Sequence, residues 1–201
     1  MNTKQKLLVL KLDVTDSMKE ADSLWQAVGS MVKMNMVVCR QSADILTAAV
    51  SRKPDWIHII SRSDSEHLFF TDGTKQSGSC KRISLIKQLL KADPVLTLLS
   101  LNSKLDKRDA ENIGQLKALL GMENGYNPLA SRLFIPRFYS NICMGMALAP
   151  AAKIAISSMQ PEVISHGGIP AMCFNKAIDP ETFTFVKQRY IPQQPIPFMM
   201  Q

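Results

Sequence analysis

Oxygen-bearing side chains cluster in one short segment near the start of the chain. Asp13, Thr15, Asp16 and Ser17 lie just after an apolar run at residues 7–10. Alternate oxygens of a tight turn can converge on a hard cation such as Mg²⁺, which binds carboxylate and hydroxyl ligands. The same residue types favour the N-cap of a helix, so a capping role for Asp16 or Ser17 is the alternative. The segment therefore predicts either a cation site or a helix start.

This acidic segment resembles the metal-ion-dependent adhesion site of von Willebrand factor A domains, where Asp-x-Ser-x-Ser occupies the same place. Asp13, Thr15 and Ser17 match that pattern, with threonine in place of the first serine. Thr71 and Asp72 resemble the acidic turn that supplies a further contact in that family, although the chain between the two segments is shorter here. The resemblance implies a Mg²⁺ site that includes Asp72.

A second resemblance covers about residues 6–128 and is to the receiver domains of two-component signalling. Residues 54–60 resemble their third strand with its lead-in, and residues 92–100 resemble the end of their third helix and the fourth strand. Ser61 stands in place of the phosphoryl-accepting aspartate, and Asn127 stands in place of the lysine. Aspartyl phosphate chemistry needs a carboxylate nucleophile, a Mg²⁺ ion and a balancing cation. The resemblance therefore implies a pseudo-receiver, which offers a surface for protein contacts.

Residues for nucleophilic catalysis are sparse. The cysteines are too far apart for a Cys-x-x-Cys motif; they are Cys39, Cys80, Cys143 and Cys173. The histidines, His58, His67 and His166, lack the spacing of metal ligands. We predict His58 to be a hydrogen-bonded core residue, because it lies inside an apolar strand. Residues 163–167 resemble the histidine strand of caspase-like proteases, whose cysteine follows after a further helix and strand. Cys173 follows His166 too soon for those elements, so a glycine turn is expected. No glycine-rich nucleotide-binding motif occurs.

Apolar runs alternate with amphipathic segments along residues 6–128. We predict strands at 6–12, 36–39, 56–60 and 95–99, and helices around 21–32, after Ser42, at 83–90 and at 113–120. This alternation predicts an α/β fold with a doubly wound, mostly parallel sheet of the Rossmann-like or flavodoxin-like type. Ligands and partners then bind beyond the carboxyl ends of the strands.

The apolar spacing also predicts which helical residues face the core. On the first two helices these are Ala21, Leu24, Trp25, Val28, Met31 and Val32, and then Ile45, Leu46, Ala49 and Val50. The polar residues 61–80 predict a loop, with an extra strand at His67–Thr71 as the alternative.

Residues 129–201 differ in composition and predict a C-terminal extension of mixed structure. Eight of the 11 prolines lie there, which places a boundary near residue 128. We expect one helical region, 130–149, interrupted by Pro136, and a short strand at 182–186. Phe198, Met199 and Met200 end the chain, where core packing is unfavourable, so we predict that they bind a partner or a second copy.

Composition limits the function classes. The 201 residues carry a formal charge of +7 at pH 7, spread over both parts of the chain. No apolar stretch is long enough to span a membrane, and the scarce cysteines predict a cytoplasmic protein. The interpretation that follows is a non-catalytic regulatory or scaffolding module that binds protein within a larger assembly and needs no cofactor. One alternative is a Mg²⁺-dependent site, of adhesion or phosphoryl-transfer type, using Asp13, Asp16 and Asp64 or Asp72. The other is a nucleic-acid-associated protein.

Overall fold

The computed structural model describes residues 4–13, 17–72, 75–125, 127–165 and 167–186. Its strands are β1 Lys6–Lys11, β2 Lys33–Val38, β3 Trp56–Ile60, β4 Arg62–Ser63, β5 His67–Thr71, β6 Gln76–Lys81, β7 Leu98–Lys104, β8 Ala118–Met122 and β9 Pro170–Phe174. Its helices are α1 Ser17–Val28, α2 Ser42–Arg52, α3 Arg82–Ala92, α4 Lys107–Glu111, α5 Pro128–Cys143, α6 Leu148–Ser157 and α7 Pro161–Ser165.

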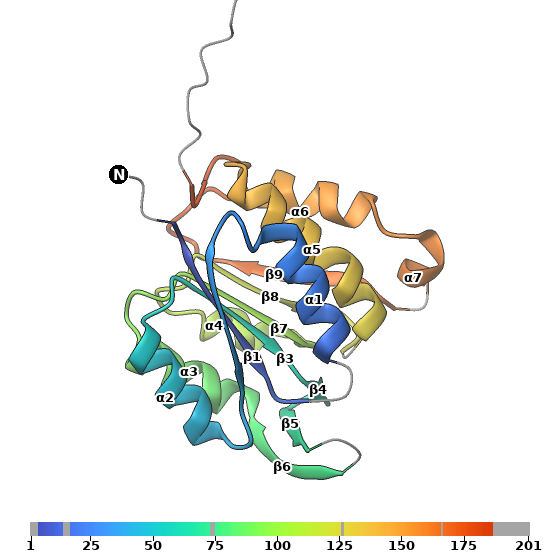
Figure 1. The fold of residues 1–201 in the computed structure, drawn as a ribbon. Helices are drawn as coiled ribbons and strands as arrows, with labels where there is room; N and C mark the ends of the chain where they lie inside the picture. The colour runs from blue at the N-terminus through green and yellow to red at the C-terminus, as the bar shows by residue number, and fades with distance from the viewer. Residues whose placement is uncertain (1–3, 14–16, 73–74, 126, 166, 187–201) are drawn as a thin grey trace, which may run out of the picture.

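A six-stranded sheet forms the centre of the molecule, in the order β2-β1-β3-β7-β8-β9 (Figure 1). The first five strands are parallel, and β9 pairs antiparallel with β8. Helices cover both faces of this sheet. The predicted α/β fold with a mostly parallel, doubly wound sheet is confirmed.

Two apolar cores lie on opposite faces of the sheet, because successive strand residues point to opposite sides. Leu7 and Val9 of β1 pack in the core under α1, α5 and α6. Leu8 and Leu10 of the same strand pack in the core under α2 and α3. Strands buried on both faces read as continuous apolar runs, which is why β1 and β3 were predictable.

A small three-stranded antiparallel sheet, β4-β5-β6, lies between β3 and α3. Its middle strand, β5, confirms the alternative prediction of an extra strand at His67–Thr71. Leu68 and Phe70 of β5 are buried against the α2/α3 core, which fixes the small sheet on the carboxyl side of the large one.

Several predicted elements are wrong. The helix expected at 113–120 is replaced by α4 and by β8, which lies between β7 and β9. The strand expected at 95–99 is displaced to β7, and residues 182–186 form no strand. Residues 130–149 belong to two helices, and α5 continues through Pro136 to Cys143. The proposed boundary at residue 128 coincides with the first residue of α5.

Three predicted core positions are also wrong. Trp25 and Val50 are more than half exposed. Met31 is exposed too, since α1 ends at Val28 and Met31 lies in the following turn. Within the described residues, no helix is long and apolar enough to cross a membrane.

One buried carboxyl gives a prediction for stability. Asp93 ends α3, and one of its oxygens accepts a hydrogen bond from the Val95 amide at 3.2 Å. Burial, and then the nearby charge of Asp55, raise the pKa of Asp93. Folding therefore favours the protonated form, so this contribution to stability is lost as the pH rises through the raised pKa. We expect Asp93→Asn to raise the unfolding temperature at neutral pH.

The amide in Asp93→Asn keeps the oxygen that accepts from Val95 and removes the buried charge. Thermal unfolding should show the gain at neutral pH and no gain below the ordinary carboxyl pKa. An equal unfolding temperature at neutral pH would contradict the prediction.

Candidate functional site

The carboxyl ends of β1 and β3 mark the topological switch point of the sheet. From β1 the chain crosses to β2 on one side, whereas β3 pairs with β1 on the other. Ligand crevices of doubly wound folds lie at such points. Asp13, just beyond β1, is buried here and lies 2.8 Å from the guanidinium Nε of Arg62 in β4. The hydroxyl of Thr71 donates to the other oxygen of Asp13 at 2.8 Å.

These contacts bear on the residues predicted to bind Mg²⁺. The structure brings Asp13 together with Thr71 through an isolated parallel bridge. It also places Arg62 on the same carboxylate, and a guanidinium repels a divalent cation. Asp72 is exposed, and Ser17 begins α1. Thr15 and Asp16 lie outside the described residues, so the metal site stays a prediction.

Adjacent strands β3 and β7 both lead into buried hydroxyls at this edge. Ser61 directly follows β3, and Ser103 lies near the end of β7. The hydroxyl of Ser63 donates to the carbonyl of Asn102 at 2.9 Å, which keeps the two strand ends together. The hydroxyls of Ser61 and Ser103 have no hydrogen-bond partner among the described residues. Neither serine has an imidazole or carboxylate base bonded to it, so neither is an activated nucleophile.

A second polar cluster lies deeper, between β3, β7, α1 and α5. His58 Nε2 is 2.8 Å from Glu20 Oε1, and His58 Nδ1 is 2.5 Å from Ser100 Oγ. Ser100 Oγ is 3.0 Å from the hydroxyl of Tyr139, and Ser131 also donates to Glu20. The prediction that His58 is a hydrogen-bonded core residue is confirmed.

The order carboxylate, imidazole and hydroxyl matches that of a hydrolytic triad. Glu20, His58 and Ser100 are all fully or almost fully buried, and Tyr139 covers the serine, so a substrate cannot reach Ser100. Burial raises the pKa of Tyr139 well above its usual range, so its hydroxyl remains a donor. The cluster therefore joins α1 and α5 to the sheet rather than performing catalysis.

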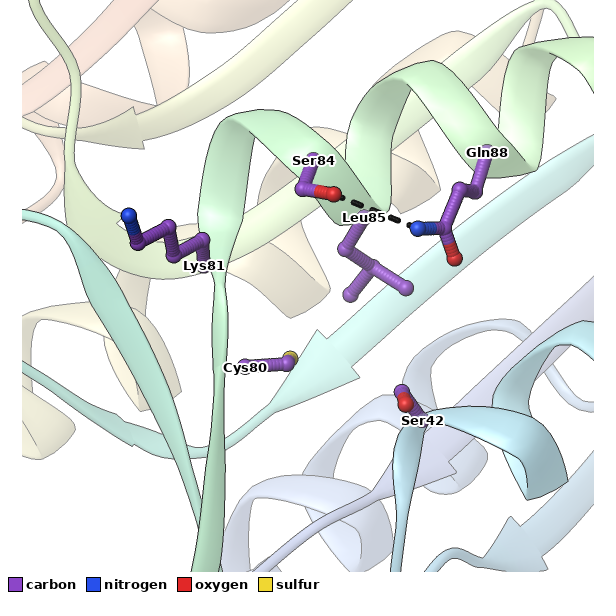
Figure 2. A pocket seen from close by; sticks show the side chains of 6 residues that line it. All are labelled: Ser42, Cys80, Lys81, Ser84, Leu85 and Gln88. Carbon is purple, nitrogen blue, oxygen red and sulfur yellow. Dashed lines mark hydrogen bonds between the residues drawn. The ribbon is translucent and has the colours of Figure 1, made fainter.

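A pocket of about 230 Å³ lies on the other face, where α2 and α3 begin (Figure 2). Its lining residues are Ser42, Cys80, Lys81, Ser84, Leu85 and Gln88. The volume is below the roughly 300 Å³ at which small-molecule sites usually begin. Burial raises the pKa of the Cys80 thiol to about 11, so the thiolate is scarce at neutral pH. This pocket is a weak candidate for chemistry.

Exposed apolar side chains line α1 and the edge strand β2. We call this set the α1–β2 apolar strip: Met18 and Trp25 of α1, Met31 of the following turn, and Met36 and Val38 of β2. Their exposed fractions are 50% for Met18, 52% for Trp25, 40% for Met31, 39% for Met36 and 49% for Val38. An exposed aromatic among methionines is typical of a protein-binding surface.

The members of the strip lie on one flank of the molecule. Met34 packs in the core under α1, so Met36 and Val38, at alternate positions of β2, face the same side as α1. On α1, Glu20 marks the flank that meets α5, because it accepts from Ser131. Each residue of an α-helix turns by about 100°, so Trp25 lies about 140° around the helix from Glu20. The Trp25 side chain therefore points away from α5 and toward β2. Figure 1 shows α1 between β2 and α5.

Sequence reasoning missed this surface because it assigned Trp25 and Met31 to the core. No local signal marked it, because Ala21, Leu24, Trp25 and Val28 have the i, i+3, i+4, i+7 spacing of an ordinary buried helix face. Phe198, Met199, Met200 and His166, which were predicted as partner-binding or turn residues, lie outside the described residues.

No protein-family model matches the chain, and no curated protein matches it.

Proposed function

We propose that this chain is a non-catalytic regulatory or scaffolding module that binds another protein within a larger assembly. The observation that carries the proposal is the α1–β2 apolar strip. Monomeric proteins rarely expose an aromatic and several methionines on one flank, because the exposure of apolar surface to water is unfavourable. A partner that covers the strip removes this unfavourable exposure. Tryptophan, the residue type of Trp25, is enriched among binding hot spots.

The strand-end edge supports the non-catalytic part of the proposal. The hydroxyls of Ser61 and Ser103 at the ends of β3 and β7 have no hydrogen-bond partner among the described residues, so no base activates either of them. Arg62 pairs with Asp13 across the switch point.

We also propose a cytoplasmic location. All four cysteines are free thiols, as expected in a reducing compartment. The partner is a protein or a second copy of the chain.

Capture from a native lysate tests the binding function. We expect a partner that is retained by the wild-type chain to be lost from Trp25→Ser, because truncating a hot-spot residue costs about 2 kcal/mol or about thirtyfold in affinity. Val50→Ser is the matched control, since Val50 is equally exposed but lies on α2. A chain without a stable partner, or one that Trp25→Ser retains as well as Val50→Ser does, would refute the proposal.

A further inference from the structure

The outer edge of β2 is unpaired within the part of the chain that the structure describes. β2 is the first strand of the six-stranded sheet, and its neighbour there is β1. The backbone N–H groups of Lys33 and Cys39 point toward β1 and donate to carbonyls on that side at 2.8 Å and 2.9 Å. In a parallel ladder alternate residues bond to the same neighbour, so Met34, Met36 and Val38 direct their N–H and C=O groups away from β1. No hydrogen bond between described residues reaches these outward groups.

The side chains along this edge are sorted by face. Met34 packs in the core under α1, so Met36 and Val38 lie on the α1 face, where they belong to the α1–β2 apolar strip. Val37 packs in the core under α2 and α3, so Lys33, four residues earlier, lies on that opposite face. A strand added to this edge therefore meets apolar side chains on one face and a lysine on the other.

Lys33 lies opposite another lysine. The register pairs it with Lys6 of β1, and both residues are exposed. Asp55 accepts from the backbone N–H of Lys6 at 2.8 Å, but it directly precedes β3, on the side of β1 away from β2. None of the ion pairs among the described residues involves either lysine. The ammonium of Lys4 lies near the same end of β2, since it donates to the carbonyl of Ser30 at 2.6 Å. Like charges on paired positions are unfavourable, and a carboxylate beside them removes the repulsion.

These charges favour an acidic partner over a second copy of the chain. If two copies paired their β2 strands antiparallel, Lys33 would lie near the far end of the other β2, where Val38 is followed by Cys39 and the exposed Arg40. Residues 31–40 contain no acidic side chain. The β2 segment of a second copy therefore offers Lys33 no carboxylate.

We propose that an extended segment of the partner protein adds to the outer edge of β2 as a further strand. Its apolar side chains lie toward Met36 and Val38, and an acidic side chain lies toward Lys33 and Lys6. Main-chain hydrogen bonds supply affinity in this mode of recognition, and alternate side-chain positions supply specificity. The inference rests on the proposed protein-binding function and names the chemistry of the partner, which is an acidic residue next to apolar residues at alternate positions.

A fluorescein-labelled peptide tests this chemistry with the full chain. The peptide alternates valine and threonine and has aspartates at both ends, so it offers the expected pattern in either direction. We expect saturable binding by fluorescence polarisation, which Lys33→Glu weakens by about tenfold or more. Lys87→Glu, which reverses an exposed charge on α3, should leave the affinity unchanged. The same peptide with lysines in place of the aspartates should bind Lys33→Glu more tightly than the wild-type chain. Absence of binding to the wild-type chain, or equal weakening by the two substitutions, would overturn the proposal.

A second pair of variants tests the strand pairing itself. Met36→Pro removes an outward N–H at an edge position, where proline is tolerated, whereas Met36→Ala shortens the side chain and keeps the N–H. We expect Met36→Pro to abolish peptide binding with an unchanged circular dichroism spectrum, and Met36→Ala to retain part of the binding. A peptide with a methylated backbone should likewise fail to bind the wild-type chain, which tests the pairing without altering the protein. Equal binding by the two variants, or binding of the methylated peptide, would overturn strand addition.

The remaining outcomes separate this inference from the binding function on which it rests. A dimer of the chain alone that Met36→Pro abolishes would show that β2 pairs with a second copy, and would overturn the acidic partner. The Trp25→Ser capture test concerns the apolar side chain on α1 and uses no peptide. Its failure would refute the binding function, whereas failure of the peptide together with successful capture would overturn strand addition alone.

Discussion

Arg82→Met is expected to lower the free energy of unfolding by about 3–5 kcal/mol, the cost of breaking a buried ion pair. Arg82 begins α3 and is buried, as is its partner Asp109 in α4. The guanidinium Nε and Nη2 lie 3.1 Å and 2.9 Å from the two carboxylate oxygens of Asp109. Methionine fills a similar volume but leaves the carboxylate charged and without its cation. Urea unfolding measures the loss.

Two further variants define the cause of that loss. Lys87→Met removes an exposed cation from the same helix, and we expect a change within about 0.5 kcal/mol. Adding Asp109→Leu to Arg82→Met removes the orphaned carboxylate, so we expect part of the stability to return. A loss for Arg82→Met no larger than that for Lys87→Met would show that the pair contributes nothing to folding.

The pair also explains why the region after β3 is structured although its sequence is polar. Arg82 Nη1 donates to the carbonyl of Ser65 at 2.8 Å, so one side chain connects the small sheet, α3 and α4. The sequence of residues 61–80 predicts a loop because its apolar content is low. A buried arginine lies outside that segment, and its partner comes 27 residues later, so no local pattern reveals the contact.

The elements that sequence reasoning placed correctly are those with unambiguous local signals. β1 and β3 are continuous apolar runs, and α2 begins at Ser42 and ends before Pro54, as the breaker residues indicate. β8 was predicted as a helix because Leu116, Leu119 and Leu120 have helical spacing. Gly121 follows them, as glycine often follows the end of a helix. In the structure, a Cβ on Gly121 would lie 2.6 Å from the carbonyl oxygen of Ser103, so the glycine permits close strand packing instead.

The same limit applies to the candidate sites. The sequence pattern predicted that Asp13 follows the carboxyl end of the first strand, where the structure has it. Arg62 was not predicted as the partner of Asp13, because the two residues meet only when β4 continues from β3. The exposure of Trp25 was also hidden, since it depends on where α5 packs against α1.

Glu20→Met is expected to lower the free energy of unfolding by about 2–6 kcal/mol, because two buried donors lose their acceptor at about 1–3 kcal/mol each. Those donors are the Nε2–H of His58 and the hydroxyl of Ser131. With the proton on Nε2, His58 accepts from Ser100 through Nδ1, and Ser100 in turn accepts from Tyr139. Each of these side chains then has a hydrogen-bond partner, from Glu20 in α1 through the sheet to Tyr139 in α5.

A double-mutant cycle with His58→Phe measures the interaction free energy between Glu20 and His58. Phenylalanine removes both ring nitrogens, so Glu20 loses one donor and Ser100 loses its acceptor. We expect the double variant to be less destabilised than the sum of the single variants, since each single change orphans a group that the other removes. Glu20→Gln keeps one acceptor oxygen and should be the mildest change. Additive losses in urea unfolding would mean that the carboxylate and the imidazole act independently, and that their burial, rather than their hydrogen bond, secures α1 against the sheet.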